Sequence, residues 1–130
     1  MAVLVQNILY ATLFLALISE TMSQPEQGPC PPETLDISQK ETGNIVQGKK
    51  EFAVEVFNWC KCAQRNVTLD CDGFQTVEKP DPVQMSISGF QCILLQGRDI
   101  IPFSRVHFKY AFDDEFPFYV FSSAPICPPN

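Results

Sequence analysis

The 130-residue sequence is poor in several residue types on which common protein chemistries depend. It has a single histidine and a single tryptophan, and its 9 Lys and Arg are outnumbered by 15 Asp and Glu, which gives a formal net charge of −6. A surface with this balance lacks the basic footprint that a phosphate backbone requires, so we expect no nucleic-acid partner. The same balance disfavours electrostatic docking on an anionic membrane.

Helical periodicity is missing after residue 23. The chain contains 11 prolines, and no later segment repeats apolar residues at i, i+3, i+4 and i+7 over three turns. Apolar and polar residues alternate instead, as is typical of half-buried strands. Strands are expected at residues 35–39, 52–60, 66–71, 92–95, 106–112 and 116–121. Turn residues separate them, at Thr42–Asn44, Gln64–Arg65, Gln96–Asp99 and Asp113–Glu115 among others, and the whole pattern predicts a small antiparallel β-sandwich.

The N-terminal region contains an apolar run from Ile8 to Ile18. Eleven residues rise about 16 Å as a helix, half of a bilayer core, so the run suits a signal peptide better than a membrane span. Thr21 and Ser23 supply small residues at −3 and −1 of a cleavage before Gln24. We expect a signal peptide over residues 1–23, a polar leader over 24–29 and a cysteine-rich domain over 30–130, secreted and without a membrane span.

Six cysteines follow the expected cleavage site: Cys30, Cys60, Cys62, Cys71, Cys92 and Cys127. An even number in a short secreted chain predicts three disulfides. The one close pair, Cys60 and Cys62, is a residue too tight for the usual zinc spacing, so we expect no metal. Folding residues 35–39 back on 52–60 brings Cys30 beside this pair, and Cys30 is therefore predicted to bond Cys60 or Cys62.

No group of side chains indicates catalysis or cofactor binding. His107 lies on the polar face of an expected strand, and no G-x-S-x-G motif is present. Asp113–Glu115 are adjacent in one turn, whereas a glycosidase needs two carboxylates facing across a cleft. Asp70–Gly73 opens like a calcium loop but lacks its remaining ligands. We therefore expect a protein that is not an enzyme and holds no cofactor.

Two further features concern the surface and the core. Asn66-Val67-Thr68 is an N-glycosylation sequon, which predicts a glycan on Asn66. Trp59 and most of the 11 phenylalanines are expected in the core because they alternate with polar residues. Residues 116–121 are apolar on both faces of the expected strand, so the second sheet or a partner must cover one face.

The cysteines stand among short motifs that extend over residues 30–127. They include Asp36-Ile-Ser-Gln39, Val46-Gln-Gly-Lys49, Phe52-Ala-Val-Glu-Val-Phe-Asn-Trp-Cys60-Lys-Cys62, Val67-Thr-Leu-Asp-Cys71-Asp-Gly-Phe74, Asp81-Pro82, Cys92-Ile-Leu94, Gly97-Arg98 and Val106-His-Phe-Lys-Tyr-Ala111. In this combination the chain resembles the plant Tapetum Determinant-like family of small secreted cysteine-rich proteins.

The resemblance implies a role in cell-to-cell signalling. Founding members of that family are extracellular ligands of a leucine-rich-repeat receptor kinase and direct cell-fate choice in the anther. On this basis we expect a ligand secreted into the apoplast, with a receptor-kinase ectodomain as its partner and its oligomeric state left open. The alternative is an extracellular carbohydrate-binding or hydrolase-inhibiting module of the cell wall.

The candidate receptor contacts are polar or aromatic residues too exposed to belong to the core. They are Arg98, Asp99, Asp113, Asp114 and Tyr119. Arg98 is the strongest single candidate, because a guanidinium is permanently charged, fork-shaped and here held at a turn.

Overall fold

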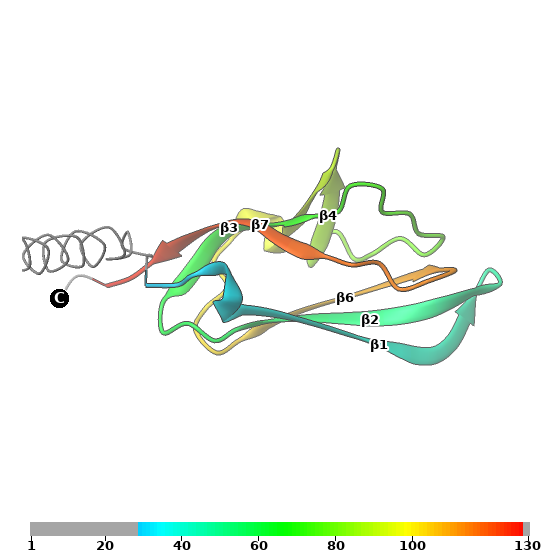
Figure 1. Ribbon diagram of the computed structural model, residues 1–130, viewed down its shortest axis with the longest axis horizontal. Coiled ribbons are helices and arrows are strands. Elements are labelled where there is room, and N and C mark those ends of the chain that lie inside the picture. Colours follow the sequence, from blue (N-terminus) through cyan, green and yellow to red (C-terminus); the bar gives the residue numbers. More distant parts are fainter. Residues whose placement is uncertain (1–28, 129–130) are drawn as a thin grey trace, which may run out of the picture.

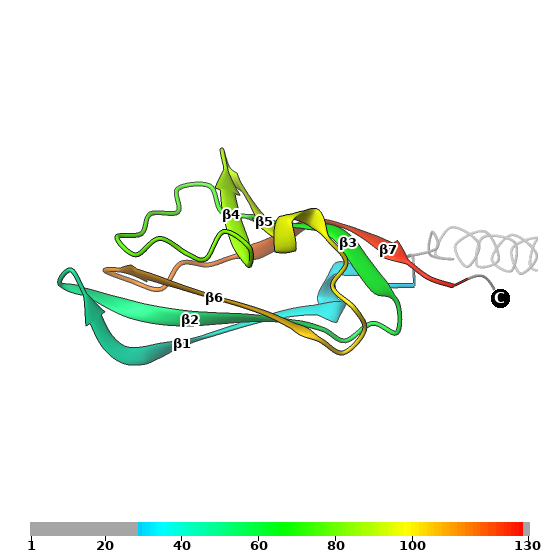
Figure 2. The same cartoon turned by 180° about the vertical axis from the view of Figure 1, so that it is seen from behind.

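The computed structural model describes residues 29–128, which form two antiparallel β-sheets packed face to face (Figures 1 and 2). The three-stranded sheet has the order β1 (Leu35–Val46), β2 (Lys49–Asn58), β6 (Arg105–Phe112). The four-stranded sheet has the order β4 (Met85–Ser88), β5 (Gln91–Leu94), β3 (Ala63–Asp70), β7 (Tyr119–Ile126). Two single 3₁₀ turns complete the fold, η1 (Pro32–Thr34) and η2 (Leu95–Gly97). The predicted β-sandwich is confirmed.

Two of the expected N-terminal features lie outside the described residues: the signal peptide over 1–23 and most of the leader over 24–29. Within residues 29–128, no helix is long and apolar enough to cross a membrane.

The alternation of β2 shows how the core is built. Phe52, Val54 and Val56 face the other sheet and are at most 4% exposed, whereas Ala53 and Phe57 face outward. Their burial is the main stabilising term for a domain of this size. The inward residues of every strand from β2 to β6 join one continuous apolar cluster.

An aromatic group closes the core at the end where β6 leads into β7. Tyr110 is fully buried and packs edge-to-face on Phe74 and Phe118, with ring centroids 5.1 and 5.7 Å apart. Its hydroxyl donates to Gln39 Oε1 at 2.6 Å and accepts from the Phe116 N–H at 2.8 Å. The apolar segment 116–121 is thus covered partly by the sandwich itself, while Tyr119 stays exposed.

Three predictions of local structure are wrong. Gln64 and Arg65 lie inside β3, because the chain reverses earlier, over residues 59–62, where it crosses between the sheets. β1 runs through the predicted turn at Thr42–Asn44, and a register shift between Glu41 and Ile45 absorbs the irregularity. Residues 85–88, where the sequence predicts no strand, form β4 against β5.

Trp59 is 59% exposed, so its predicted place in the core is also wrong. It follows β2 with the parity of the outward-facing Phe57, and the two rings lie 4.4 Å apart. Phe90, Phe103 and Phe121 are exposed as well. Each of them stands at a turn or a bulge, where alternation with polar neighbours no longer reports which side is buried.

Three disulfides link Cys30 to Cys60, Cys62 to Cys127 and Cys71 to Cys92. This confirms the predicted number and, of the two partners left open for Cys30, selects Cys60. Cys60 and Cys62 lie in the crossover from β2 to β3, so the first two disulfides tie both ends of the described chain to one corner (Figure 1). Closing the 30-residue loop of Cys30–Cys60 stabilises the fold by about 3–4 kcal/mol in the chain-entropy view.

Peptide mapping without reduction will check this pairing. Trypsin cleaves after Lys61 and separates Cys60 from Cys62, so mass spectrometry distinguishes their partners. We expect linked peptides containing Cys30 with Cys60 and Cys62 with Cys127, and a Cys71–Cys92 bond inside the single peptide 66–98, because trypsin does not cleave between Lys79 and Pro80. A Cys30–Cys62 linkage, or free thiols in the folded protein, would contradict the structure.

Candidate functional site

Two buried amides hold the corner where the chain crosses between sheets. Asn58 is fully buried and its Nδ2 donates to the carbonyl oxygens of Cys62 and Ile100, at 3.1 and 2.9 Å. Its Oδ1 accepts from the Cys60 N–H and from Gln64 Nε2, each at 2.9 Å. The Asn58 side chain therefore bridges the crossover and the loop that leads into β6.

Gln64 extends this network to both ends of the described chain. It is fully buried; its Nε2 also donates to Thr34 Oγ1 at 3.1 Å, and its Oε1 accepts from Ser123 Oγ at 2.6 Å. Its backbone exchanges two hydrogen bonds with Ile100, at 2.8 and 3.0 Å. Buried polar groups are costly unless paired, and among the described residues no buried side-chain nitrogen or oxygen lacks a partner.

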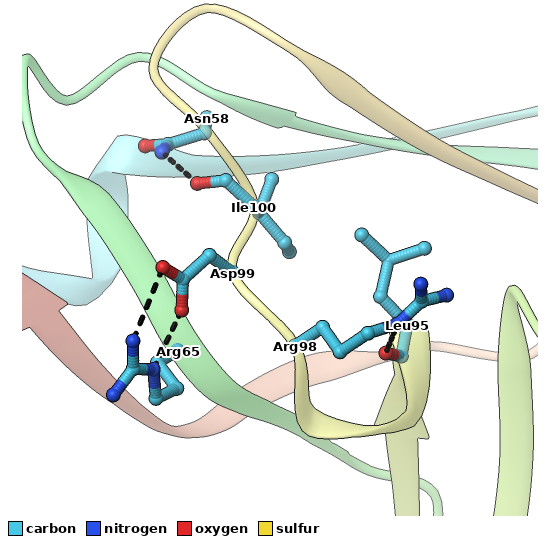
Figure 3. A network of polar contacts seen from close by, with 6 residues as sticks. All are labelled: Asn58, Arg65, Leu95, Arg98, Asp99 and Ile100. Carbon is cyan, nitrogen blue, oxygen red and sulfur yellow. Dashed lines mark hydrogen bonds and ion pairs between the residues drawn. The ribbon is translucent and has the colours of Figure 1, made fainter.

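Residues 95–104, which we name the corner loop, are fixed on this network. Beyond Ile100, the Phe103 N–H donates to the Asn58 carbonyl at 2.8 Å, and the Asn58 N–H donates to the Ser104 carbonyl at 3.0 Å. Figure 3 shows the loop passing over Asn58 and β3. A loop with this many backbone anchors is rigid although much of it lies at the surface.

An ion pair anchors the middle of the corner loop to β3. Arg65 donates to both oxygens of Asp99, from Nε at 2.6 Å and from Nη2 at 3.3 Å (Figure 3). Hydrogen bonding from Arg65 lowers the pKa of Asp99. The pair is open to solvent, so its contribution to stability is modest, and its main effect is geometric.

The corner loop also holds unusual backbone conformations. Leu95, Gln96 and Phe103 have φ values of 49, 57 and 59°, in the left-handed region that side chains disfavour by about 1 kcal/mol or more each. Gly97 shares this region, and a Cβ there would lie 2.9 Å from Asn66 Oδ1. Such strain persists where the surroundings fix the backbone, and it accumulates at functional sites.

Apolar side chains project from this fixed loop into solvent. Ile101 is 61% exposed and Phe103 is 59% exposed, and Trp59 follows β2 at the same corner. The sequence did not lead us to place any of these three residues in a functional site. The available signal was Ile101-Pro102-Phe103, an apolar triplet between two strands where a polar loop is the norm.

The structure places the predicted contact residues on separate surfaces. Arg98 lies in the corner loop, where its Nε donates to the Leu95 carbonyl at 3.1 Å and the rest of the guanidinium faces outward (Figure 3). Asp113 and Asp114 follow the other end of β6, about 26 Å of extended strand away. Asp113 there pairs with Lys49 at 2.6 Å, and Tyr119 lies on β7.

Asn66, the predicted glycosylation site, is exposed at a register shift of β3 against β7. It neighbours Arg65, so a glycan on Asn66 would lie beside the corner loop. Its accessibility agrees with the sequon, and the modification itself stays a prediction.

A pair of carboxyl groups lies on the outer side of the three-stranded sheet. Glu51 accepts from Thr42 Oγ1 at 2.7 Å and from Asn44 Nδ2 at 3.1 Å. Hydrogen bonds from Glu78, Thr42 and Asn44 lower the pKa of Glu51 to about 2, while burial and the neighbouring Glu51 raise the pKa of Glu78 to about 7. Lys109 favours the charged form of both carboxyl groups. At mildly acidic pH, Glu51 is therefore charged and Glu78 is protonated.

The remaining candidate residues, His107 and the cysteines, form neither a catalytic group nor a metal site. His107 is exposed, and its ring makes no hydrogen bond or ion pair within residues 29–128. The sulfurs of Cys30, Cys60 and Cys62 lie within 4.8 Å of one another, but each belongs to a disulfide and is no metal ligand.

These features define a class of protein: a disulfide-stapled antiparallel β-sandwich with a rigid, exposed loop at its cross-linked corner. The chain belongs to the family described as Tapetum determinant 1, C-terminal, whose model matches residues 32–127. It is similar to the TPD1 protein homolog 1B of Oryza sativa subsp. japonica, with 26% identity over 101 residues. That alignment covers 76% of this chain and 60% of the relative, so the chain spans less than two thirds of the relative's length. No solved structure matches.

Replacing Asn58 tests the corner network. Asn58→Ala removes the partner of the buried Cys60 N–H and should lower the free energy of unfolding by about 3 kcal/mol. Asn58→Asp turns a carboxyl oxygen toward two carbonyl oxygens and should destabilise at least as much. Urea denaturation of the oxidised protein measures both, with the exposed Gln75→Ala as the control. A change below 0.5 kcal/mol (about the scatter of surface substitutions) would show that the network is not structural.

The carboxyl pair predicts a pH dependence of stability. The pKa of Glu78 is about 7 in the folded protein against an ordinary value of 4.5, so stability falls as the pH rises between these values. Glu51 acts in the opposite sense at lower pH, between about 2 and 4.5. Glu78→Gln should flatten the decline in melting temperature from pH 4.5 to 7. The control Glu115→Gln should leave this decline unchanged. Parallel profiles for Glu78→Gln and the unmodified protein would refute the pairing.

Proposed function

We propose that this protein is a secreted ligand that binds the ectodomain of a leucine-rich-repeat receptor kinase in cell-to-cell signalling, and that it has no catalytic activity of its own. Family membership supports the ligand class. The three disulfides support a secreted state, because such bonds persist mainly in oxidising compartments.

The exposed corner loop is the observation that carries the proposal. Ile101, Phe103 and Trp59 offer apolar surface of the kind that anchors protein interfaces, and Phe103 is kept there at a conformational cost. Because the loop backbone is already fixed, little conformational entropy is lost on docking. Stacked leucine-rich repeats present an extended concave surface that suits a protruding rigid corner.

Polar residues around the loop take different parts in this proposal. Arg98 lies in the same corner loop and offers its free guanidinium nitrogens to a partner carboxylate. Asp99 is committed to Arg65, so its part is to hold the loop. Asp113, Asp114 and Tyr119 face other directions and are secondary candidates.

Binding of the mature, oxidised domain to a panel of leucine-rich-repeat receptor ectodomains tests the function. We expect one ectodomain to bind with a sub-micromolar dissociation constant. Phe103→Asn should weaken that binding at least tenfold without unfolding the protein, because asparagine tolerates a positive φ. Phe121→Gln, at a similarly exposed phenylalanine of β7, is the control, since glutamine there creates no glycosylation sequon with Ser122 and Ser123.

The outcomes separate the function from its site. If no ectodomain binds below 1 µM, the ligand proposal fails for this protein. If one binds and neither Phe103→Asn nor Arg98→Glu changes the affinity, the function stands and the corner loop is the wrong surface.

A further inference from the structure

Free positive charge gathers on one part of this acidic protein. Within residues 29–128, four of the nine Lys and Arg form ion pairs: Lys49, Lys50, Arg65 and Arg105. The others make no ion pair there: Lys40, Lys61, Lys79, Arg98 and Lys109. Three of these five, Lys40, Lys79 and Lys109, line two adjoining cavities on the three-stranded sheet.

The two cavities form one shallow site, which we name the outer hollow. One measures about 360 Å³ and lies between β6 and the loop of residues 78–84. The other measures about 400 Å³ and lies over β1 and β2. They share Ala53 and His107, so the only histidine of the chain stands between them.

Strand register explains how the charges converge. Lys40, Ala53 and Lys109 form one row across β1, β2 and β6. With strands about 4.8 Å apart, the two lysine Cα atoms lie about 10 Å from each other, on either side of the small Ala53 side chain. Their flexible ammonium groups can therefore reach a single anion above Ala53.

Acidic groups at the outer hollow are largely engaged elsewhere. Glu55 forms an ion pair with Arg105 at 2.9 Å, and Asp81 accepts from the Val83 N–H at 3.0 Å in its own turn. Glu78 adjoins Glu51, and its pKa of about 7 keeps it protonated in mildly acidic solution. Lys40 and Lys79 form no ion pair within residues 29–128, and Lys109, which also lies near the charged Glu51, keeps its ammonium group out of any ion pair there.

We propose that the outer hollow binds an acidic saccharide, with a carboxylate or sulfate group held between Lys40 and Lys109 above Ala53. The floor offers no exposed aromatic or leucine side chain that would anchor a peptide. Ser38 and Gln84 instead supply polar groups beside the cations, as the hydroxyls of a sugar require. The site lies apart from the corner loop, so it is independent of the proposed receptor contact.

Calorimetric titration of the folded domain at low ionic strength tests this site. The probes are trigalacturonic acid for carboxylates, a heparin-derived tetrasaccharide for sulfates, neutral maltotriose and hexa-aspartate. We expect one acidic saccharide to bind with a dissociation constant below about 1 mM, and maltotriose not to bind. Lys40→Glu/Lys109→Glu should weaken binding at least tenfold, whereas Lys61→Glu/Arg98→Glu, with the same change in net charge, should weaken it less than threefold.

Ala53→Leu provides a second variant that leaves the charge unchanged. It fills the outer hollow from an outward-facing position and should also weaken saccharide binding, while the melting temperature reports that the fold is intact. Equal losses in the two charge-reversed variants would show non-specific attraction and overturn the proposal. Tighter binding of hexa-aspartate would assign the site to an acidic peptide instead, and no binding of either acidic saccharide at 1 mM would refute it.

Discussion

Two amide side chains, Asn58 and Gln64, lie where the chain leaves one sheet and enters the other, and much of the molecule's geometry depends on their being fully hydrogen-bonded. A buried amide without partners costs several kcal/mol, so the surrounding backbone can adopt only the arrangement that satisfies all of its donors and acceptors. That requirement fixes the crossover at Cys60–Cys62, the path of the loop at Ile100 and the positions of the two chain segments at Thr34 and Ser123.

The disulfides act on the same corner by a different mechanism. Cys30–Cys60 and Cys62–Cys127 limit the unfolded chain, whereas the amide network selects one folded arrangement. Together they let a small domain keep a strained, partly apolar loop at its surface. Without such support, we expect the backbone of Phe103 to leave its left-handed conformation and its ring to pack against other apolar groups.

The three-stranded sheet has an edge that must be protected from pairing with another chain. β6 is an edge strand, and the segment around Thr76 covers it: the Ala111 N–H donates to Thr76 Oγ1 and the Val77 N–H donates to the Ala111 carbonyl. This placement brings Glu78 against Glu51, and the residues that follow form one wall of the outer hollow.

Alternation in β2 and β6, cysteine number and turn residues sufficed to predict a three-disulfide β-sandwich, because burial of every second residue is a local property of a strand. The same reasoning failed for Trp59 and for Gln64, since both lie at the crossover. There, neither the alternation of apolar and polar residues nor turn propensity indicates which side chains are buried. Arg98 was singled out from its turn, but Ile101 and Phe103 were not. Their exposure follows from hydrogen bonds to Asn58 and Gln64, more than 30 residues earlier in the chain, and only the packed tertiary structure brings those partners together.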